Sequence, residues 1–445
     1  MGGYRCRLSM NSRPEPDPIA RFSELRWTAG VIGLGYVGLP LLMTSVLRGL
    51  GGIGFDVSES RISALKAGKS HIDDISDKDL EKALVEGVEF TSDWRRLGDA
   101  DALFICVPSP LGRNRQPDLS FIEAASQTIE KVARRGQLIV LESTSYPGTT
   151  EEFLVPALQR AGLSLDNDVF LAFSSERVSP GDEMLIGNIP KVVGGVTELS
   201  GFVAEAAYQR IVASIHRVSS SRVAEMAKLL ENTYRAVNIG LINEMAQLAH
   251  ELDIDIWEVV DAAATKPFGF QPFYPGPGVG GHCIPLDPQY LSWRAREANF
   301  STRFIDIAEQ VNSKMPSYNA TRISDLLNNR GLPVLGSEVL GVGIAYKPNV
   351  ADDRESAAID VLKLLSRKGA RISVLDPVVG EQRIREHGFD PVAPEESLTR
   401  FQLAAILTDH ASIDYERIAR EVKVVYDARG VYRRLGIGSE NVVAL

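Results

Sequence analysis

A cysteine stands in a glycine-rich segment, next to a histidine and close to an aspartate. The segment reads Gly-Gly-His-Cys-Ile-Pro-Leu-Asp, and Cys283 comes four residues before Asp287. One interpretation is structural: Cys283 is a small buried hydrophobe, and Asp287 with Pro288 forms the N-cap and first turn of a helix. The other makes Cys283 a thiolate nucleophile, and His282 has no role in either. Hydride-transfer chemistry needs such a nucleophile when an aldehyde is oxidised further, because its carbon must first become tetrahedral.

A second glycine-rich segment, near the start of the chain, is typical of dinucleotide binding. Gly33, Gly35 and Gly38 have the spacing GxGxxG, between an apolar run and a helical pattern, and Asp56 ends the next apolar run. Glycines at these positions let the backbone approach a pyrophosphate at a helix N-terminus. A carboxylate at Asp56 accepts hydrogen bonds from a ribose hydroxyl and repels a 2′-phosphate, which favours NAD over NADP. The alternative is that these glycines serve packing alone.

Two further sets of polar residues could border a ligand. Lys228 and Asn232 lie four apart in a long helical pattern and therefore share one face, which is either solvated or able to stabilise an oxyanion. Thr144 and Glu176 follow apolar runs, at the carboxyl ends of predicted parallel strands, where such sheets bind ligands. Thr149 or Thr150 is expected to be a helix N-cap.

The elements that position these residues can be predicted from the sequence. Short apolar runs alternate with amphipathic segments, and this pattern predicts parallel sheets with helical crossovers. Strands are expected at these places: 31–32, 52–55, 102–107, 138–141, 169–173, 191–194, 339–345, 371–375, 404–407 and 422–426. Residues 221–252 have apolar positions three and four apart and predict one long helix, roughly 45 Å at 1.5 Å per residue. More helix is expected around 255–264 and 303–312, separated by a glycine-proline loop at 272–288.

The predicted fold class is therefore α/β, with two Rossmann-like parallel-sheet domains joined by a central helical domain that contains the long helix. The segments VIGLGYVG and VLGVGIAY resemble each other, which hints at two related sheets, but the second lacks the third glycine of a dinucleotide site. The expected divisions are a flexible leader at 1–26, an NAD-binding domain at 27–215, the helical domain at 216–318 and a second Rossmann-like domain at 319–445.

Composition narrows the range of partners. The chain has 445 residues and a formal charge of -10, which disfavours binding to nucleic acid or to an anionic membrane surface. Three cysteines in so long a chain favour a reducing cytoplasm over a disulfide framework. The apolar stretch at 31–47 contains three glycines and a proline, so neither a membrane span nor a signal sequence is expected. No histidine or cysteine spacing indicates a metal site.

Seven motifs in order along the chain resemble the nucleotide-sugar dehydrogenase family, over about residues 27–435. They are GLGYVGLP, CVPSPL, ESTSYPGTT, SSERVSPG, AEMAKLLENTYRAVNIGLINE, GPGVGGHCIPLDP and AYKPNVADDRES. The resemblance implies an NAD-dependent, four-electron oxidation of the C6 alcohol of a UDP-hexose to a carboxylate. Within the family, residues 265–288 look most like the UDP-N-acetylglucosamine 6-dehydrogenase branch.

The resemblance also implies roles for individual residues. Cys283 would attack the aldehyde and give a thiohemiacetal and then a thioester, while Lys228 and Asn232 stabilise the oxyanion. Asp287 would assist proton movement near Cys283, and Thr144 and Glu176 would orient the water or act as base. The implied cofactor contacts are Gly33, Gly35, Tyr36, Val37, Gly38, Asp56, Arg61, Pro108 and Thr144. The implied substrate contacts are Glu176, Arg177, Lys228, Asn232, Phe273, Tyr274, Gly280, Gly281, Lys347, Arg354 and Arg429.

Three alternatives to this function remain. The sugar could be that of UDP-glucose or UDP-N-acetylmannosamine, since the epimer depends on the shape of the pocket. A two-electron β-hydroxyacid dehydrogenase of similar domain order would need no cysteine, and a non-enzymatic NAD-binding role is the most remote possibility. The long helix predicts a homo-oligomer. The resemblance implies the same, because the family forms dimers or larger assemblies.

Overall fold

The computed structural model describes residues 17–24, 26–72, 75–112, 116–177 and 189–445. By its internal contacts the chain divides into two compact units. The first contains residues up to 109 together with 119–226, and the second contains 110–118 together with 227–445. The division falls within the long helix, and the predicted helical domain is not a compact unit of its own. No helix in the described ranges is long and apolar enough to cross a membrane.

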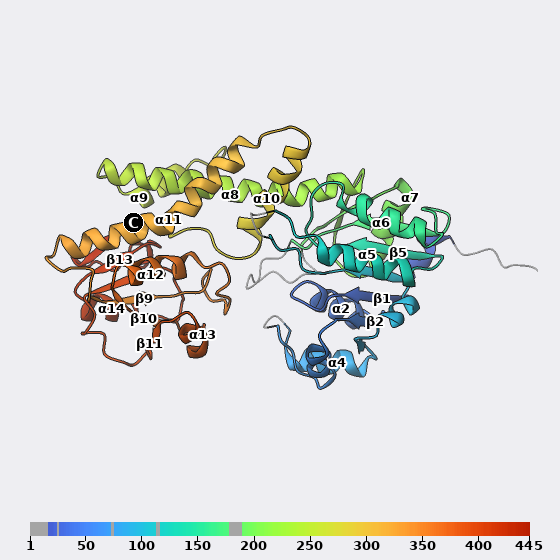
Figure 1. Ribbon diagram of the computed structural model, residues 1–445, viewed down its shortest axis with the longest axis horizontal. Helices are drawn as coiled ribbons and strands as arrows, with labels where there is room; N and C mark the ends of the chain where they lie inside the picture. The colour runs from blue at the N-terminus through green and yellow to red at the C-terminus, as the bar shows by residue number, and fades with distance from the viewer. Residues whose placement is uncertain (1–16, 25, 73–74, 113–115, 178–188) are drawn as a thin grey trace, which may run out of the picture. The chain divides into compact units, whose positions relative to one another are not determined.

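The first unit is built on a sheet with the strand order β3-β2-β1-β4-β5-β6-β7-β8 among the described residues (Figure 1). Its strands are β1 (Thr28–Ile32), β2 (Gly51–Phe55), β3 (Glu89–Thr91), β4 (Ala102–Ile105), β5 (Gln137–Leu141), β6 (Val169–Phe173), β7 (Lys191–Gly195) and β8 (Ile215–Val218). Neighbouring strands are parallel except for β6 and β7, which are antiparallel. The first residue of β7 therefore lies at the edge where β6 ends.

Helices cover both faces of this sheet. Successive residues of a strand point to opposite faces, so each face has its own set of side chains for helices to pack against. One face packs α1 (Pro18–Ser23), α2 (Gly38–Leu47), α4 (Asp77–Val85) and α7 (Glu198–Tyr208) around residues such as Phe104. The other packs the 3-10 helix η1 (Trp94–Asp99), α5 (Ser120–Val132) and α6 (Thr149–Arg160) around Leu103 and Ile105. The short helix α3 (Glu59–Lys66) follows β2.

One correction concerns the predicted flexible leader. Residues 1–16 lie outside the described part of the chain, but the structure begins with the helix α1, capped by Asp17. Its Phe22 is fully buried against Trp27, with their ring centroids 5.6 Å apart. Arg21 donates to the carbonyl of Gly136 at 2.9 Å. The boundary at residue 26 is therefore wrong for residues 17–23, because one aromatic side chain anchors a segment that lacks any apolar period.

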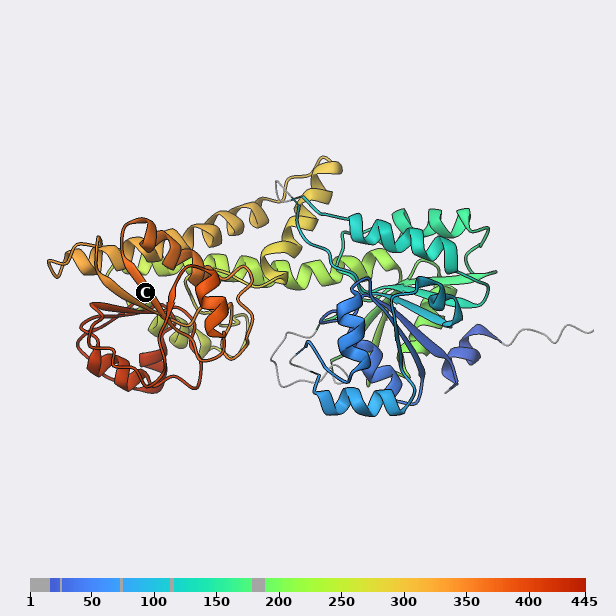
Figure 2. The ribbon, with the colours of Figure 1, turned by 60° about the horizontal axis from the view of Figure 1, so that its bottom comes forward.

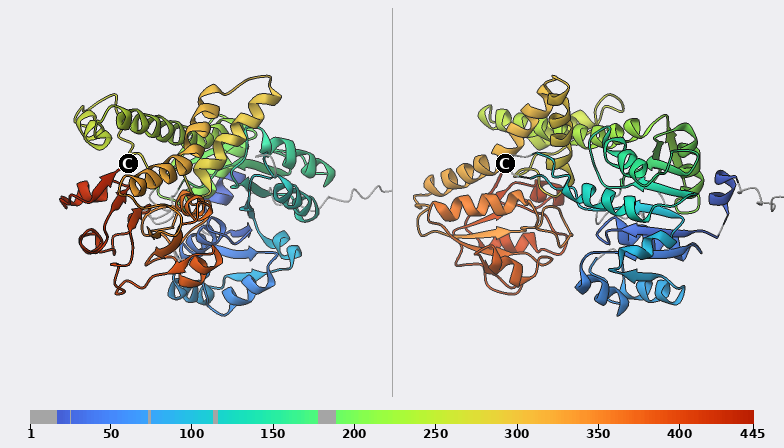
Figure 3. Two further views of the ribbon diagram at one scale, coloured as in Figure 1. Left: turned by 60° about the vertical axis from the view of Figure 1, so that its left-hand side comes forward. Right: turned by 45° about the vertical axis from the view of Figure 1, so that its right-hand side comes forward.

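The second unit contains a parallel sheet of order β11-β10-β9-β12-β13-β14 (Figure 3). Its strands are β9 (Glu338–Val342), β10 (Arg371–Leu375), β11 (Asp390–Pro391), β12 (Leu403–Ile406), β13 (Val425–Asp427) and β14 (Val442–Ala444). Its helices are α12 (Ala357–Arg367), α13 (Glu381–Glu386), α14 (Tyr415–Glu421) and α15 (Val431–Leu435). The central order β11-β10-β9-β12-β13 repeats β3-β2-β1-β4-β5 of the first unit, which confirms the hint of two related sheets.

Four further helices belong wholly or mostly to the second unit (Figure 2). They are α8 (Ser221–Glu251), α9 (Ile256–Ala264), α10 (Cys283–Glu297) and α11 (Arg303–Asn328). The helices α8 and α11 lie side by side, with Ala308 against Gly240: a methyl group on Gly240 would come within 3.1 Å of the Ala308 Cα. The single helix predicted at 221–252 is confirmed.

Two helix boundaries differ from what the sequence favoured. The helix α10 begins at Cys283, so Asp287 lies inside it and is not its N-cap. The helix α11 continues through Pro316, so the boundary expected near residue 318 falls within a helix. Both Pro288 and Pro316 lie inside their helices, where each removes one N–H donor from the intrahelical ladder. Tertiary packing of the flanking segments outweighs that loss.

Candidate active site

The glycine turn of the first unit has the geometry that a dinucleotide requires. Gly33 has a φ of +93°, and a methyl group there would lie 2.6 Å from the carbonyl oxygen of Cys106. A methyl group on Gly38 would lie 1.9 Å from the carbonyl oxygen of Gly33. One on Gly35 would meet nothing within 4 Å. Gly33 and Gly38 are therefore required by the fold, while Gly35 leaves the backbone open where a phosphate would approach. Beside it, Tyr36 is exposed and Val37 precedes α2.

Asp56 lies at the end of β2, where the ribose of a bound dinucleotide would be expected. Its Oδ2 accepts hydrogen bonds from the Leu34 N–H at 2.9 Å and from Arg61 Nη1 at 2.7 Å, and its Oδ1 accepts one from the Ser58 N–H at 2.9 Å. Burial would raise the pKa of Asp56, but the hydrogen bonds from Ser58, Leu34 and Arg61 outweigh it and lower the pKa. Asp56 is therefore anionic at neutral pH and suits a ribose hydroxyl better than a phosphate.

We expect Asp56→Ala to raise the KM for NAD about 10- to 100-fold, because a charge-assisted hydrogen bond contributes about 1.5–3 kcal/mol. The KM for NADP should fall in the same variant, since repulsion by the carboxylate is lost and Arg61 is released. Initial rates with both cofactors measure this. Asp77→Ala, which removes an exposed carboxylate of the same unit paired with Lys69 at 2.9 Å, is the control. An unchanged preference for NAD in Asp56→Ala would contradict the assignment.

The strand ends of the first unit hold Thr144, half-buried after β5, and Pro108, exposed after β4. The structure brings Glu176 close to Glu142, which follows β5, through a residue that the sequence analysis did not single out. The buried Lys191 donates to Glu142 Oε2 at 2.9 Å and to Glu176 Oε2 at 3.1 Å. Arg177, beside Glu176, donates from Nη1 to the Pro190 carbonyl at 2.9 Å.

The start of α6 is capped differently from the expectation of Thr149 or Thr150. Gly148 occupies the N-cap, with a φ of +106°. The buried carboxylate of Glu225, from the first turn of α8, accepts from the Gly148 N–H at 2.5 Å and from the Thr150 N–H at 2.9 Å. Burial raises the pKa of Glu225 to about 7 despite these bonds. A distant carboxylate thus replaces the local hydroxyl cap, which no local sequence signal indicates.

In the second unit, α8 and α10 carry four of the predicted catalytic residues. Asn232 donates a hydrogen bond to the carboxylate of Asp287, which is buried one turn after Cys283 on α10. Lys228 lies one turn before Asn232 on α8, half-buried. The Cys283 side chain is exposed to solvent, so the structure contradicts its interpretation as a buried hydrophobe.

The charges around this cluster point to proton transfer. Burial raises the pKa of Asp287 to about 6, while Lys228 and the hydrogen bond from Asn232 oppose that rise. The surrounding protein raises the pKa of the Cys283 thiol, first by restricting its hydration and then through Asp287, against the effects of Lys228 and Arg354. The resting sulfur is therefore a thiol at neutral pH, and it needs a base to become a nucleophile. Asp287, one turn away and poised near neutrality, has the properties of that base.

The glycine-proline loop before Cys283 is held by residues from distant parts of the second unit. The Gly281 N–H donates to the Arg354 carbonyl at 3.3 Å, and the ring of Tyr346 leaves no room for a side chain at Gly281, whose φ is +82°. A methyl group on Gly280 would lie 2.8 Å from the Glu355 carbonyl oxygen. The segment that carries Lys347 and Arg354 therefore lies against the glycines next to the nucleophile.

Three other predicted substrate contacts lie in or beside the middle of the same loop. A methyl group on Gly276 would lie 2.7 Å from Arg429 Nη1, so this guanidinium lies beside the loop. Tyr274, exposed on the loop, stacks on Trp257 of α9 with ring centroids 5.5 Å apart and planes at 14°. Phe273 packs edge-on against Tyr234 at 5.9 Å. The contact of Trp257 with the loop could not be predicted from sequence, because its place in an amphipathic helix indicates a core residue.

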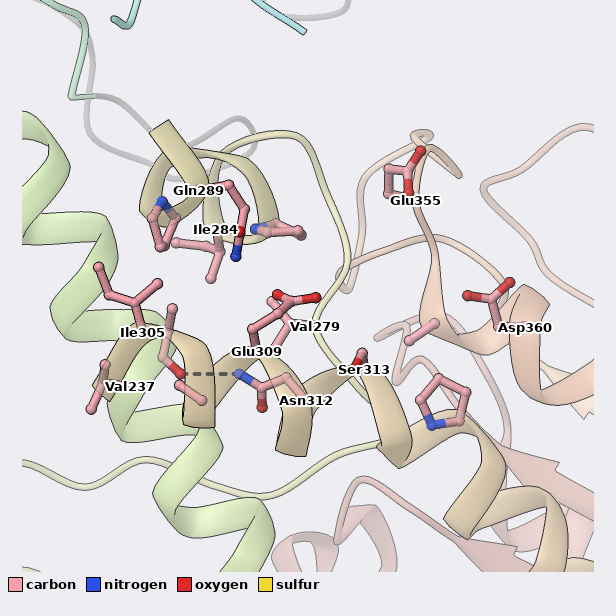
Figure 4. A pocket seen from close by; sticks show the side chains of 16 residues that line it. Val237, Val279, Ile284, Gln289, Ile305, Glu309, Asn312, Ser313, Glu355 and Asp360 are labelled. Carbon is pink, nitrogen blue, oxygen red and sulfur yellow. Dashed lines mark hydrogen bonds between the residues drawn. The ribbon is translucent and has the colours of Figure 1, made fainter. Parts of the chain in front are cut away.

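A cavity of about 290 Å³ lies next to the first turn of α10 (Figure 4). Figure 4 shows Glu309 and Asn312 of α11 facing Ile284 and Gln289 of α10, with Asn312 Nδ2 donating to the Ala236 carbonyl at 3.0 Å. Three carboxylates line this cavity, those of Glu309, Glu355 and Asp360. Three carboxylates disfavour a diphosphate, so we do not assign this cavity to the phosphates of a nucleotide. Within the described ranges no group of three or more His, Cys, Asp or Glu side chains is arranged to hold a metal ion.

Comparisons with known proteins agree with this arrangement. Three models of the UDP-glucose/GDP-mannose dehydrogenase family match in order: its NAD binding domain at residues 28–212, its central domain at 222–314 and its UDP binding domain at 340–434. The chain is 35% identical to the UDP-N-acetyl-D-glucosamine 6-dehydrogenase of Salmonella typhi, over 90% of this chain and 95% of that protein. It is 36% identical to the protein of the same name from Pseudomonas aeruginosa, over 81% and 86%.

A solved structure, the UDP-D-ManNAc dehydrogenase from Pyrococcus horikoshii, has a TM-score of 0.83 and 30% identity, and covers 94% of this chain and 98% of that one. All three domains of the family match this chain. Relatives above 30% identity also cover most of both chains, and these two findings together assign the family. This chain therefore belongs to the UDP-glucose/GDP-mannose dehydrogenase family, as an NAD-dependent nucleotide-sugar dehydrogenase.

Proposed function

We propose that the enzyme oxidises the C6 hydroxyl of a UDP-N-acetylhexosamine, UDP-GlcNAc in the first place, to the carboxylate. The observation that carries this proposal is the exposed thiol of Cys283 one turn from the buried Asp287, to which Asn232 donates. A dehydrogenase that stopped at the aldehyde would not need this arrangement. The acidic sugar nucleotide would then serve surface polysaccharide synthesis in the cytoplasm.

NAD, when bound at the turn of Gly33, Gly35 and Gly38, supplies the acceptor for the hydride at each oxidation. Asp287 takes the proton of Cys283 as the sulfur bonds to the aldehyde carbon. Lys228 and Asn232 stabilise the oxyanion that forms on that carbon. Loss of the second hydride leaves a thioester on Cys283, and water releases the carboxylate with Thr144 and Glu176 as the proposed water-orienting and basic groups.

The proposed order of sugar substrates is inferred from the substrates that the names of similar proteins state. UDP-N-acetyl-D-glucosamine 6-dehydrogenase is the name of the relatives at 35% and 36% identity. The UDP-N-acetyl-D-mannosamine dehydrogenase of Pyrococcus horikoshii is 32% identical, over 92% of this chain. UDP-N-acetylmannosamine is therefore the second candidate, and UDP-glucose the third.

The test is the yield of NADH per sugar with excess NAD and limiting UDP-GlcNAc, beside UDP-ManNAc, UDP-GalNAc and UDP-glucose. We expect two NADH per UDP-GlcNAc, with the other three sugars slower. One NADH per sugar would mean that the reaction stops at the aldehyde and that the proposed role of Cys283 is wrong. Two NADH from another sugar would keep the mechanism and change the substrate.

We also propose that two copies of the chain associate through α8. Leu230, Tyr234, Leu241 and Leu248 recur at intervals of four and seven along this helix, and each is about half exposed. An apolar stripe of this length on a helix is typical of an interface between chains. The 3.5-residue average spacing keeps the stripe on one side, so a second copy of the same helix would complement it.

We expect light scattering to give twice the 48.6 kDa mass of one chain, or a higher multiple. Replacing both Leu241 and Leu248 with glutamate should give the monomer mass, because four desolvated charges would face each other in the dimer. Leu435→Glu, at an equally exposed leucine on α15, is the control and should leave the mass unchanged. A wild-type monomer would contradict the interface.

A further inference from the structure

The first unit contains a buried ion cluster in which the proposed mechanism uses Glu176 but gives no role to Lys191 or Glu142. Lys191 begins β7, and its side chain is 4% exposed. Its ammonium lies between the carboxylates of Glu142, 0% exposed, and Glu176, 13% exposed. The hydroxyl of Tyr208 donates to the second oxygen of Glu142, and its ring lies 5.7 Å from the Lys191 ammonium. Burying charges in this way has a cost that apolar residues would avoid, so the cluster calls for a functional reason.

The topology explains how Lys191 reaches this position. Because β7 is antiparallel to β6, Phe173 pairs with Gly194 and Ala172 with Gly195. Continuing that register by three residues places Lys191 opposite Glu176. A parallel β7 would have carried its first residue to the opposite edge of the sheet, away from the strand ends that bind ligands.

The two carboxylates of the cluster differ in how fully they are buried. Glu142 is fully enclosed, and both its oxygens accept hydrogen bonds, from Lys191 and from Tyr208. Glu176 keeps contact with solvent, while its Oε2 accepts from Lys191 and its Oε1 from the Arg177 N–H at 2.7 Å. Glu142 therefore balances the charge of Lys191, and Glu176 is the carboxylate that can exchange a proton.

We propose that Lys191 is a positioning residue that keeps the carboxylate of Glu176 ionised and fixed in orientation, so that Glu176 acts as the base in thioester hydrolysis. This inference rests on the proposed function. In that step a water oxygen bonds to the acyl carbon, and Glu176 takes one proton of the water. The carbon–sulfur bond breaks with its electrons on sulfur, which recovers a proton to restore the Cys283 thiol, and the carboxylic acid product loses its proton to solvent.

The electrostatics of the cluster agree with this role. Burial would lower the pKa of Lys191, but Glu142 and Glu176 raise it above its usual value, so the lysine stays charged. Burial raises the pKa of Glu142, and the charge of Glu176 adds to that rise while Lys191 opposes it. Among the residues that the structure describes, Tyr208 on α7 and Cys106 after β4 are further titratable neighbours, and burial raises the pKa of both well above the usual value, so both stay neutral. The charged guanidinium of Arg177 follows Glu176 in the chain.

The test compares two variants that differ only at Lys191. Lys191→Met alone would leave Glu142 buried without a cation and could prevent folding, so Glu142→Gln serves as the background. Acid quench and protein mass give the rate of acyl-enzyme loss against pH, and NADH absorbance gives the rate of the hydride steps. Near-UV circular dichroism and NAD affinity establish that both variants are folded.

We expect the acid limb of hydrolysis to lie at lower pH in Glu142→Gln than in the wild type, because a negative neighbour of Glu176 is lost. In the double variant Glu142→Gln, Lys191→Met it should move up by about 1 pH unit or more relative to Glu142→Gln, with the hydride steps unchanged. The same acid limb in both variants would overturn the inference, and so would a parallel loss of hydride transfer and hydrolysis. A wild-type enzyme that forms no acyl-enzyme from any UDP-sugar would instead refute the proposed function.

Discussion

Cys283→Ala is expected to lower the NADH yield from two to at most one per sugar, and to reduce formation of the carboxylate by about 10³-fold or more. The first oxidation needs a hydride acceptor and a base but no sulfur. The second needs a tetrahedral carbon, which the thiol of Cys283 would supply. The expected product of the variant is therefore the aldehyde, trapped with hydroxylamine and identified by mass.

Cys106→Ala is the matched control for this prediction. Cys106 is buried beside the Gly33 turn, so its removal should lower stability slightly and leave two NADH per sugar. If Cys283→Ala still gave two NADH at the wild-type rate, the aldehyde would be oxidised as its hydrate. Water would then replace sulfur as the nucleophile, and the thioester would be refuted.

The order of the fold could be predicted because its signals are local. Short apolar runs, each followed by glycine or a polar turn, mark β1, β2 and β4, and the same pattern returns at β9 and β12. The spacing of three and four marks α8 over its whole length. Local signals failed at two boundaries. Asp287 lies inside α10, although Asp followed by Pro is typical of a helix start, and the division expected at residue 318 lies inside α11.

Within the site, residues on one element could be paired from sequence, and residues on different elements could not. Lys228 with Asn232, and Cys283 with Asp287, are both four apart on one helix, so a shared face follows from the helical period. The hydrogen bond from Asn232 to Asp287 joins residues 55 apart and depends on how α8 packs against α10. Lys191 was read only as the start of a strand, since its place beside Glu176 depends on the reversed direction of β7.

Asp287→Asn is expected to lower kcat by about 10²- to 10⁴-fold, the usual contribution of a general acid or base. The amide can still accept the hydrogen bond from Asn232, so the geometry around Cys283 should persist while the proton acceptor is lost. Loss of the negative charge also lowers the pKa of the Cys283 thiol. Alkylation of Cys283 by iodoacetamide at pH 7 should therefore become faster in a variant that turns over more slowly.

The same substitution should raise the free energy of unfolding above about pH 6, although it lowers activity. Burial raises the pKa of Asp287 from 3.8 to about 6, so the folded chain binds this proton more tightly than the unfolded chain does. The resulting stabilisation is complete below about pH 4 and is lost as the pH rises through 6. Above that, ionised Asp287 costs on the order of 2–3 kcal/mol, at 1.36 kcal/mol per pKa unit, and asparagine removes that cost.

Denaturant unfolding at pH 4.5 and pH 8 measures this difference, with Asp325→Asn, at an exposed aspartate of α11, as the control that should show none. We expect Asp287→Asn to exceed the wild type in stability at pH 8 by clearly more than at pH 4.5. Equal stability at both pH values would mean that Asp287 is not held in a desolvated site, and a loss at pH 8 would mean that its charge supports the fold. Either result would remove the argument for Asp287 as the base, because an aspartate with an ordinary pKa is too weak a base to take the proton of a thiol near neutral pH.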